Sequence, residues 1–276
     1  MPATLTIPKV PFGKAEISRL VVGQNHFYGF SHFNRELDTL IREWHTPERV
    51  CAALHSCEQD GINAYQYVHN VQRNYPDWQR FQAEGGKLHL LALAPGTEPA
   101  DVVKTIQPLA LVHHGEITDR AFQNGTLQDV REYTKKVRQT GVLVGVSTHK
   151  PEVIRTIEEE GWDIDCYFAC AYNRTRTQEE LRKLLSEIPV PAGEVYLPGD
   201  PARMFKVVRQ TKKTCFVFKI LAAGRITNSP ASVDQVFRTA FESIKPNDCV
   251  MVGMSQRIKD EVRENAERAQ RILRRS

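Results

Sequence analysis

One short stretch of this sequence, Pro108-Leu-Ala-Leu-Val-His-His-Gly-Glu116, combines side chains that could do chemistry. An apolar run ends there at once in two imidazoles, a glycine and a carboxylate. Imidazole and carboxylate groups transfer protons near neutral pH and also bind divalent metals. Because parallel α/β folds place their chemistry after the carboxyl ends of strands, His113 and Glu116 are predicted to be catalytic residues.

Polar and titratable side chains follow the other apolar runs of the chain in the same way. These are Asn25, His26, Gln66, His69, His149, Asn173, Arg174 and Lys219. Histidine is not a usual filler of a barrel core, so this clustering needs a cause. One cause would be a divalent metal such as zinc, manganese or iron, with His26, His113, Glu116 and His149 as ligands. Alternatively, His113 hydrogen-bonds a substrate hydroxyl and His149 simply precedes a helix.

Lys219 lies within an apolar strand, Cys215 to Ile220, where an amine is costly unless it is paired or used. It is predicted to be catalytic, either as an electrostatic clamp for a substrate oxygen or as a base with a lowered pKa.

An aromatic segment, Phe27-Tyr28-Gly29-Phe30 with Phe33, follows the first strand. Flat aromatic faces among polar groups suit a sugar or another polyol, whereas a purely hydrophobic plug over a barrel would have the same composition. The residues predicted to contact substrate are Asn25, Tyr28, Gln66, His69, Asn173 and Arg174.

The elements that must position these groups alternate between strands and helices. The predicted strands are 17–23, 62–68, 87–94, 109–112, 142–147, 165–172, 215–220 and 249–252, with helices between them, for example 47–59, 127–140 and 232–243. Each strand is a nearly continuous apolar run, which indicates a parallel sheet buried on both faces. Eight such units favour a (β/α)8 TIM barrel over residues 1–276 as a single domain, preceded by a β-hairpin. A doubly wound sheet is the alternative, but no GxGxxG follows the first strand.

Several segments, in the correct order, resemble the aldo-keto reductase family. They are Phe12-Gly-Lys-Ala-Glu-Ile-Ser-Arg-Leu-Val-Val-Gly23, Asp60-Gly-Ile-Asn63, Leu109-Ala-Leu-Val-His113, Gly145-Val-Ser-Thr148, Ala171-Tyr-Asn173, Phe218-Lys-Ile-Leu-Ala-Ala-Gly224 and Val252-Gly-Met-Ser255 with Glu264-Asn265. The resemblance implies the same barrel, and it implies that His113, rather than His114, faces the interior. It also implies a nucleotide site for NADP built from Ser147, Thr148, Gly224, Arg225, Ser255 and Asn265.

The reductive machinery of that family is matched only at His113. Gln66 stands where the aspartate is expected, no residue after it matches the tyrosine acid, and Leu91 to Pro95 lacks the lysine. Without a proton donor, ordinary carbonyl reduction is disfavoured. The sequence therefore predicts an enzyme for proton transfer on a sugar or keto-sugar-like small molecule, as a lyase, isomerase or hydrolase assisted by a metal or by Lys219. The alternatives are an NADP-dependent reductase with another proton donor and a non-catalytic scaffold.

Composition limits the partners. The formal net charge is +4, and the basic residues near the C-terminus share a helix with glutamates, so no nucleic-acid partner is expected. The six cysteines lack CxxC spacing, which is typical of a reducing compartment, and no signal peptide or membrane span is recognised. We expect a cytoplasmic protein and make no prediction of its oligomeric state.

Overall fold

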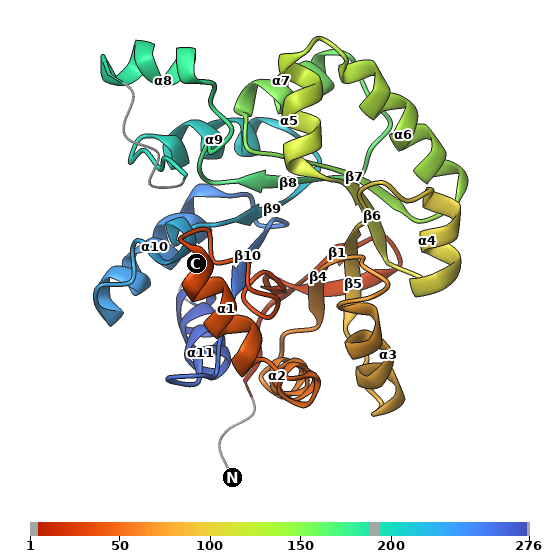
Figure 1. Cartoon of the computed structure of the whole chain (residues 1–276), viewed down its shortest axis with the longest axis vertical. Coiled ribbons are helices and arrows are strands. Elements are labelled where there is room, and N and C mark those ends of the chain that lie inside the picture. Colours follow the sequence, from red (N-terminus) through yellow and green to blue (C-terminus); the bar gives the residue numbers. More distant parts are fainter. Residues whose placement is uncertain (1–4, 188–193, 275–276) are drawn as a thin grey trace.

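The computed structural model describes residues 5–187 and 194–274. Its centre is a closed barrel of eight parallel strands in the order β10-β3-β4-β5-β6-β7-β8-β9 (Figure 1). The strands are β3 (Leu20–Gly23), β4 (Ala64–Val68), β5 (His89–Leu93), β6 (Ala110–His113), β7 (Leu143–Thr148), β8 (Cys166–Cys170), β9 (Thr214–Phe218) and β10 (Cys249–Gly253). The predicted (β/α)8 barrel is therefore confirmed.

A short antiparallel hairpin, β1 (Lys9–Phe12) and β2 (Ala15–Ser18), precedes the barrel, as predicted. Its apolar residues Val10, Phe12 and Ile17 pack with the interior of the barrel, and the Phe12 ring meets Phe216 edge-on with centroids 5.1 Å apart. The hairpin thus closes the end of the barrel at which the strands begin, which leaves the carboxyl ends of the strands for a site.

Alternation along each strand separates two hydrophobic cores. In β6, Ala110 and Val112 point into the barrel with Phe168 and Phe216, whereas Leu111 packs outward against the helices. The period of two continues past the end of the strand. It therefore decides which of the two consecutive histidines after Val112 faces the interior.

Helices surround the barrel (Figure 1). They are α1 (Arg35–Trp44), α2 (Pro47–Gln59), α3 (Tyr75–Ala83), α4 (Pro99–Ile106), α5 (Gly115–Gln123), α6 (Leu127–Gln139), α7 (Pro151–Glu159), α8 (Gln178–Leu185), α9 (Asp200–Gln210), α10 (Pro230–Ser243) and α11 (Glu261–Leu273), with a 3-10 turn η1 (Ala222–Gly224). Within the described ranges, no helix has the length and apolarity that a bilayer crossing would need.

Two of these helices lie where the sequence predicted only a loop. Asn34 caps α1 by accepting a hydrogen bond from the Leu37 backbone amide at 2.8 Å. Gly115 begins α5 directly after β6, so Glu116 lies in the first turn of a helix. A carboxylate at that position is favoured by the helix dipole, and α5 fixes its direction.

Candidate functional site

The carboxyl ends of the strands surround a cavity of about 230 Å³, which we call the barrel mouth. Its polar and charged lining residues are Asn25, His32, Gln66, His114, Glu116, Ser147, His149, Arg174 and Lys219. Phe30, Phe168, Phe218 and Met251 supply apolar surface. A concave site with a few convergent polar groups on an apolar floor is the usual form of a small-molecule site.

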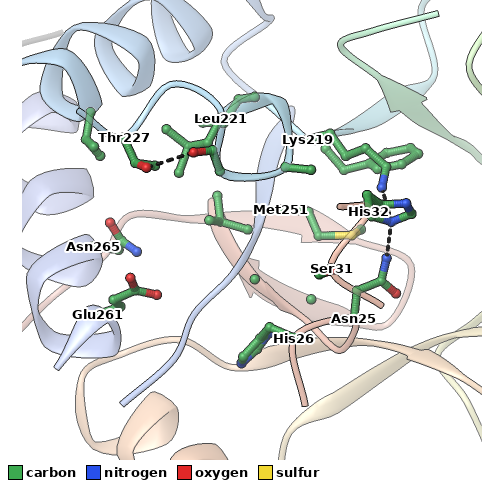
Figure 2. Close-up of a pocket in the computed structure, with 18 of the residues that line it drawn as sticks. Asn25, His26, Ser31, His32, Lys219, Leu221, Thr227, Met251, Glu261 and Asn265 are labelled. Atoms are coloured by element: carbon green, nitrogen blue, oxygen red, sulfur yellow. Dashed lines mark hydrogen bonds between the residues drawn. The ribbon is translucent and has the colours of Figure 1, made fainter. Parts of the chain in front are cut away.

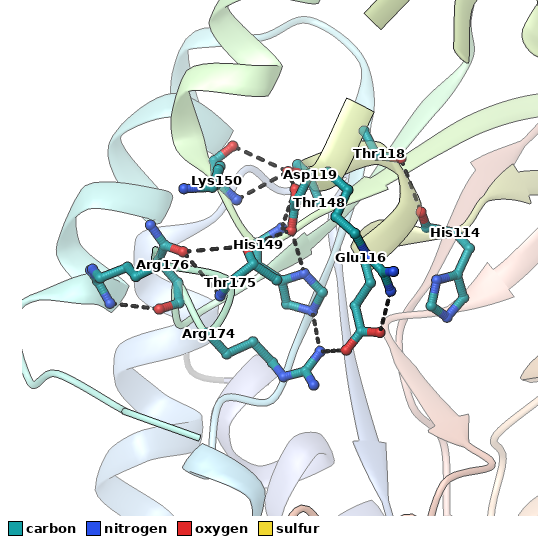
Figure 3. Close-up of polar contacts among 12 residues, drawn as sticks. His114, Glu116, Thr118, Asp119, Thr148, His149, Lys150, Arg174, Thr175 and Arg176 are labelled. Carbon is teal, nitrogen blue, oxygen red and sulfur yellow. Dashed lines mark hydrogen bonds and ion pairs between the residues drawn. The ribbon is translucent and has the colours of Figure 1, made fainter. Parts of the chain in front are cut away.

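A buried dyad of His149 and Asp119 forms one wall of the mouth (Figure 3). The Asp119 carboxylate is fully buried and accepts a hydrogen bond from His149 Nδ1 at 2.7 Å. The Thr175 hydroxyl and the backbone amide of His149 also donate to this carboxylate. With the Nδ1 proton held by Asp119, Nε2 of His149 carries the lone pair and faces Arg174 in the mouth at 3.4 Å.

Burial lowers the pKa of His149, and Asp119 opposes that shift without reversing it. The imidazole is therefore neutral near pH 7. A neutral histidine with an oriented Nδ1–H and an Nε2 lone pair that faces the mouth beside Arg174 is suited to act as a general base.

Arg174 crosses the mouth between two carboxylates. One of its guanidinium nitrogens lies 2.6 Å from Glu116 Oε1, and another forms an ion pair with Glu194. Burial opposes ionisation of Glu116, but Arg174 and the neighbouring histidines hold the pKa of its carboxyl below the usual value. The Arg174 charge is thus shared between two anions and held in a fixed position.

Lys219 reaches the mouth from the end of β9, next to β8, and its amine contacts Nε2 of His32 (Figure 2). His32 Nδ1 lies 2.8 Å from Glu194 Oε1, and the Asn25 amide lies 3.1 Å from Nε2. The Lys219 backbone has a left-handed φ of 57°, which is unusual for a residue other than glycine. Burial lowers the pKa of Lys219 to about 8.

A second cavity of about 690 Å³ opens from the mouth and shares Asn25, His32 and Lys219 with it (Figure 2). It runs between the segment after β9 and the N-terminal half of α11. Gly224, Glu261 and Asn265 line its far end. The site therefore has a small polar chamber inside the barrel and a longer, mainly apolar extension.

The prediction that His113 faces the interior is wrong. Its Nδ1 lies 2.7 Å from the Thr118 hydroxyl of α5, and its ring packs edge-on against Tyr133 of α6. Strand alternation directs Val112 inward, His113 outward and His114 back into the mouth. The residue that the family resemblance selected is therefore held between strand and helices, and His114 is the histidine that faces the mouth.

The predicted set of metal ligands does not converge either. His26 lines the second cavity and accepts a hydrogen bond from the Met254 amide at 3.2 Å, while His113 lies outside the barrel. Glu116 and His149 do share the mouth, but each is engaged by Arg174 or Asp119. Across residues 5–187 and 194–274, no three His, Cys, Asp or Glu side chains are grouped in a way that could hold a metal ion.

The residues predicted to contact substrate divide into two groups. Asn25, Gln66 and Arg174 line the mouth. The other three have partners elsewhere. The Tyr28 hydroxyl donates a hydrogen bond to Asp77 at 3.0 Å, and the buried His69 ring packs on Tyr67 and Tyr75. The backbone N–H of Asn173 donates to the Asp200 carboxylate. For Tyr28 the structure supports the hydrophobic plug, because Phe27 and Tyr28 belong to the outer core.

The predicted nucleotide-binding residues are also dispersed. Gly224 and Asn265 line the second cavity, and Ser147 lines the mouth. Thr148 instead donates to Asp119 at 2.5 Å, and the Ser255 amide donates to Glu261 at 2.8 Å. The Arg225 guanidinium stacks on the rings of Phe33 and Tyr196, 4.3 and 4.1 Å from their centroids.

Besides His114, sequence reasoning missed Asp119, His32 and Glu194. Asp119 follows Glu116 by three residues, the spacing that places two side chains on one helix face, but α5 itself was not predicted. His32 lies in a stretch without helix or strand periodicity, which is typical of a surface loop. Residues 190–198, which include Glu194, also have no such pattern, and residues 190–193 lie outside the described ranges.

No protein-family model matches this chain, and no curated protein shows significant similarity to it. Among solved structures, a truncated 3-deoxy-D-arabino-heptulosonate 7-phosphate synthase from Thermotoga maritima aligns with 98% of this chain and 92% of its own, at 11% identity and a TM-score of 0.54. An N-acetylneuraminic acid synthetase from Leptospira borgpetersenii serovar Hardjo-bovis aligns with 99% and 90%, at 6% identity and a TM-score of 0.52.

Such low identities establish the shared TIM-barrel fold and nothing finer. Neither of these two structures is an aldo-keto reductase. The barrel that the family resemblance implied is confirmed, and the reductase chemistry stays a prediction.

Proposed function

We propose that this chain is an enzyme that moves a proton at the carbon next to a carbonyl group of a small polyoxygenated substrate, such as a sugar or keto-sugar. One observation carries the proposal: Nε2 of His149, oriented by Asp119, shares the barrel mouth with the amine of Lys219. His149 is the base, and Lys219 activates the carbonyl. Isomerases and lyases that act on such substrates both begin by removing a proton from the carbon next to the carbonyl.

The charge balance of the mouth favours a neutral substrate with many hydroxyl groups. Arg174 and Lys219 contribute two positive charges. The negative charges are those of Glu116 in the lining and of Glu194, which pairs with Arg174 from outside it. Since these balance, the mouth is not an anion trap, but it offers donors and acceptors on several sides. Its 230 Å³ corresponds to about eight water molecules at roughly 30 Å³ each, which suits a small sugar.

The names of the two barrel neighbours support the choice of probes. One is named as a heptulosonate phosphate synthase and the other as an N-acetylneuraminic acid synthetase, so both names refer to sugar acids. Polyoxygenated carbonyl compounds are accordingly the first substrates to test on this chain.

Proton exchange gives a direct test. The protein is incubated with dihydroxyacetone, pyruvate or D-ribose in D₂O, and the loss of carbon-bound hydrogen next to the carbonyl is followed by proton NMR. His149→Gln and Asp119→Asn are each expected to slow the exchange by about 10²- to 10⁴-fold, the usual contribution of a general base. His55→Gln, on the outer side of α2 beside Glu84, is the matched control and retains the wild-type rate. Equal rates in His149→Gln and in the wild type would refute the assignment.

An NADP-dependent reductase is the second candidate, and the second cavity favours it. That cavity is continuous with the mouth and reaches Gly224 and Asn265, two of the predicted cofactor residues. The fit is partial because Thr148 and Arg225 are engaged by Asp119 and by two aromatic rings. A bound nicotinamide would supply a hydride to a carbonyl in the mouth. Quenching of tryptophan fluorescence on titration with NADPH tests this candidate, and no quenching at millimolar NADPH would end it.

A further inference from the structure

We propose that Lys219 activates the carbonyl covalently, by forming an imine with the substrate. This inference rests on the proposed function, and it adds a nucleophile and a class of intermediate to that site. The argument concerns which groups surround the amine and which groups are kept away from it.

The first observation is that the Lys219 amine lacks the carboxylate partner that the buried Lys150 and the partly buried Lys245 have. Lys150, only 2% exposed, pairs with Glu180 at 3.0 Å, and Lys245 pairs with Asp248 at 2.9 Å. Among the described residues, Lys219 has no carboxylate within ion-pairing distance. A carboxylate partner would keep the amine protonated, and a protonated amine is not a nucleophile.

The carboxylates of Glu116, in the mouth, and Glu194, next to it, are paired with Arg174 instead. Each forms an ion pair with the guanidinium. Neither carboxylate pairs with the Lys219 amine, and the Arg174 charge nearby disfavours protonation of that amine. The burial of the lysine acts in the same direction, and it is the largest cause of the lowered pKa of Lys219.

The third observation is the group that does contact the amine. Nε2 of His32 faces the Lys219 nitrogen, and Nδ1 of the same ring is fixed by Glu194 at 2.8 Å. With its Nδ1 proton donated to Glu194, His32 presents a lone pair to the amine and can accept a proton from it. The same imidazole can then return that proton to a departing hydroxyl group.

The chemistry balances with water as the one additional reactant. The lone pair of the Lys219 nitrogen attacks the carbonyl carbon, the π electrons move to the oxygen, and a proton passes from nitrogen to oxygen through His32. Loss of the hydroxyl with a proton releases water and leaves an iminium. His149 then removes the proton on the adjacent carbon to form an enamine. Reprotonation and addition of water return the product and the free amine.

Reductive trapping tests this proposal. The protein is mixed with dihydroxyacetone, pyruvate or D-ribose, treated with sodium cyanoborohydride, and analysed by intact and peptide mass spectrometry. The expected product is a mass gain equal to the carbonyl compound less one oxygen atom, located on the Lys219 peptide. The neutral amine fraction at pH 7 is about 9% for a pKa of about 8, against about 0.03% for an ordinary lysine. Trapping should therefore be concentrated on the Lys219 peptide, and adducts spread evenly over the lysines of the chain would contradict the proposal.

Variants separate this inference from the proposed function. His149→Gln should retain trapping and lose deuterium exchange, because imine formation does not need that base. Lys219→Met should lose both, with its circular dichroism checked against the wild type. If this variant does not fold, the pH dependence of trapping in the wild type decides, because the yield should rise with pH through about 8. Exchange that depends on His149 without an adduct on Lys219 overturns the imine and leaves the proton transfer. Absence of both overturns both.

Discussion

The His113 side chain, which the sequence placed in the catalytic site, is expected instead to make folding stability depend on pH. It lies between β6 and α6, where burial, and to a lesser extent the neighbouring His114, lower its pKa to about 4. In the unfolded chain the pKa of histidine is about 6.5. Between these two values the unfolded state binds more protons than the folded state.

The sign and size of the effect follow from that difference. A folded-state pKa below the unfolded value contributes stability that is fully present above pH 6.5 and is lost as the pH falls toward about 4. At about 1.4 kcal/mol per pKa unit, this side chain accounts for a loss of about 3 kcal/mol in the free energy of unfolding over that range. The variant His113→Gln, which does not titrate, should remove this part of the loss.

Urea unfolding followed by circular dichroism at several pH values between about 7.5 and 4.5 measures this effect. Burial also lowers the pKa of His26, His114 and His149, so the wild type will lose more than the contribution of His113. The informative quantity is the wild-type stability minus that of His113→Gln, which should shrink by up to about 3 kcal/mol as the pH falls. The control variant His55→Gln shows how much the exchange of an imidazole for a glutamine amide changes stability at a partly exposed position. A difference that stays constant with pH would refute this reasoning.

Three further predictions concern other parts of the molecule. Gly115→Ala should slow proton exchange, because a Cβ there would lie 2.9 Å from Ser147 Oγ and 3.1 Å from the His149 ring and would displace that ring. NMR in D₂O measures the exchange rate, and an unchanged rate would contradict this prediction. Arg176→Ala leaves the buried Asp200 with the mostly exposed Arg203 as its remaining cation, and should lower the unfolding free energy by about 3–5 kcal/mol in urea titrations; a change below about 1 kcal/mol would contradict this. Dialysis against EDTA should leave the melting temperature and the exchange rate unchanged, because the four predicted metal ligands do not converge. A loss of exchange activity on dialysis that added zinc or manganese restores would contradict this prediction.

The fold could be predicted from the sequence because strand periodicity and helix signals repeat eight times in a consistent order. The local direction of side chains was harder. The family resemblance places His113 in the interior. Consecutive strand residues face opposite sides, but all four residues from Leu109 to Val112 are apolar, so the sequence does not say which alternate pair faces inward. The structure places Ala110 and Val112 there, and hence His114.

The missed members of the site come from segments without strong patterns. Asp119 is on α5, a helix of nine residues that starts directly after a strand with no side-chain cap. His32 and Glu194 are in irregular segments 162 residues apart, and only the folded chain brings them together. Lys219 was predicted correctly to lie in the mouth because a lysine in an apolar strand conflicts with burial unless it has a role.

The α1 helix has one further consequence for how a ligand could reach the longer cavity. All ten of its residues are described, and none is buried, yet Leu37 and Ile41 line the cavity beneath it. Moving such a helix aside exposes little apolar surface, so its local opening costs far less than unfolding the barrel. A bound molecule in contact with Leu37 and Ile41 would give α1 the apolar contacts that it otherwise lacks, and would stabilise this helix. Occupancy of the site would then be visible at α1 as slower amide hydrogen exchange.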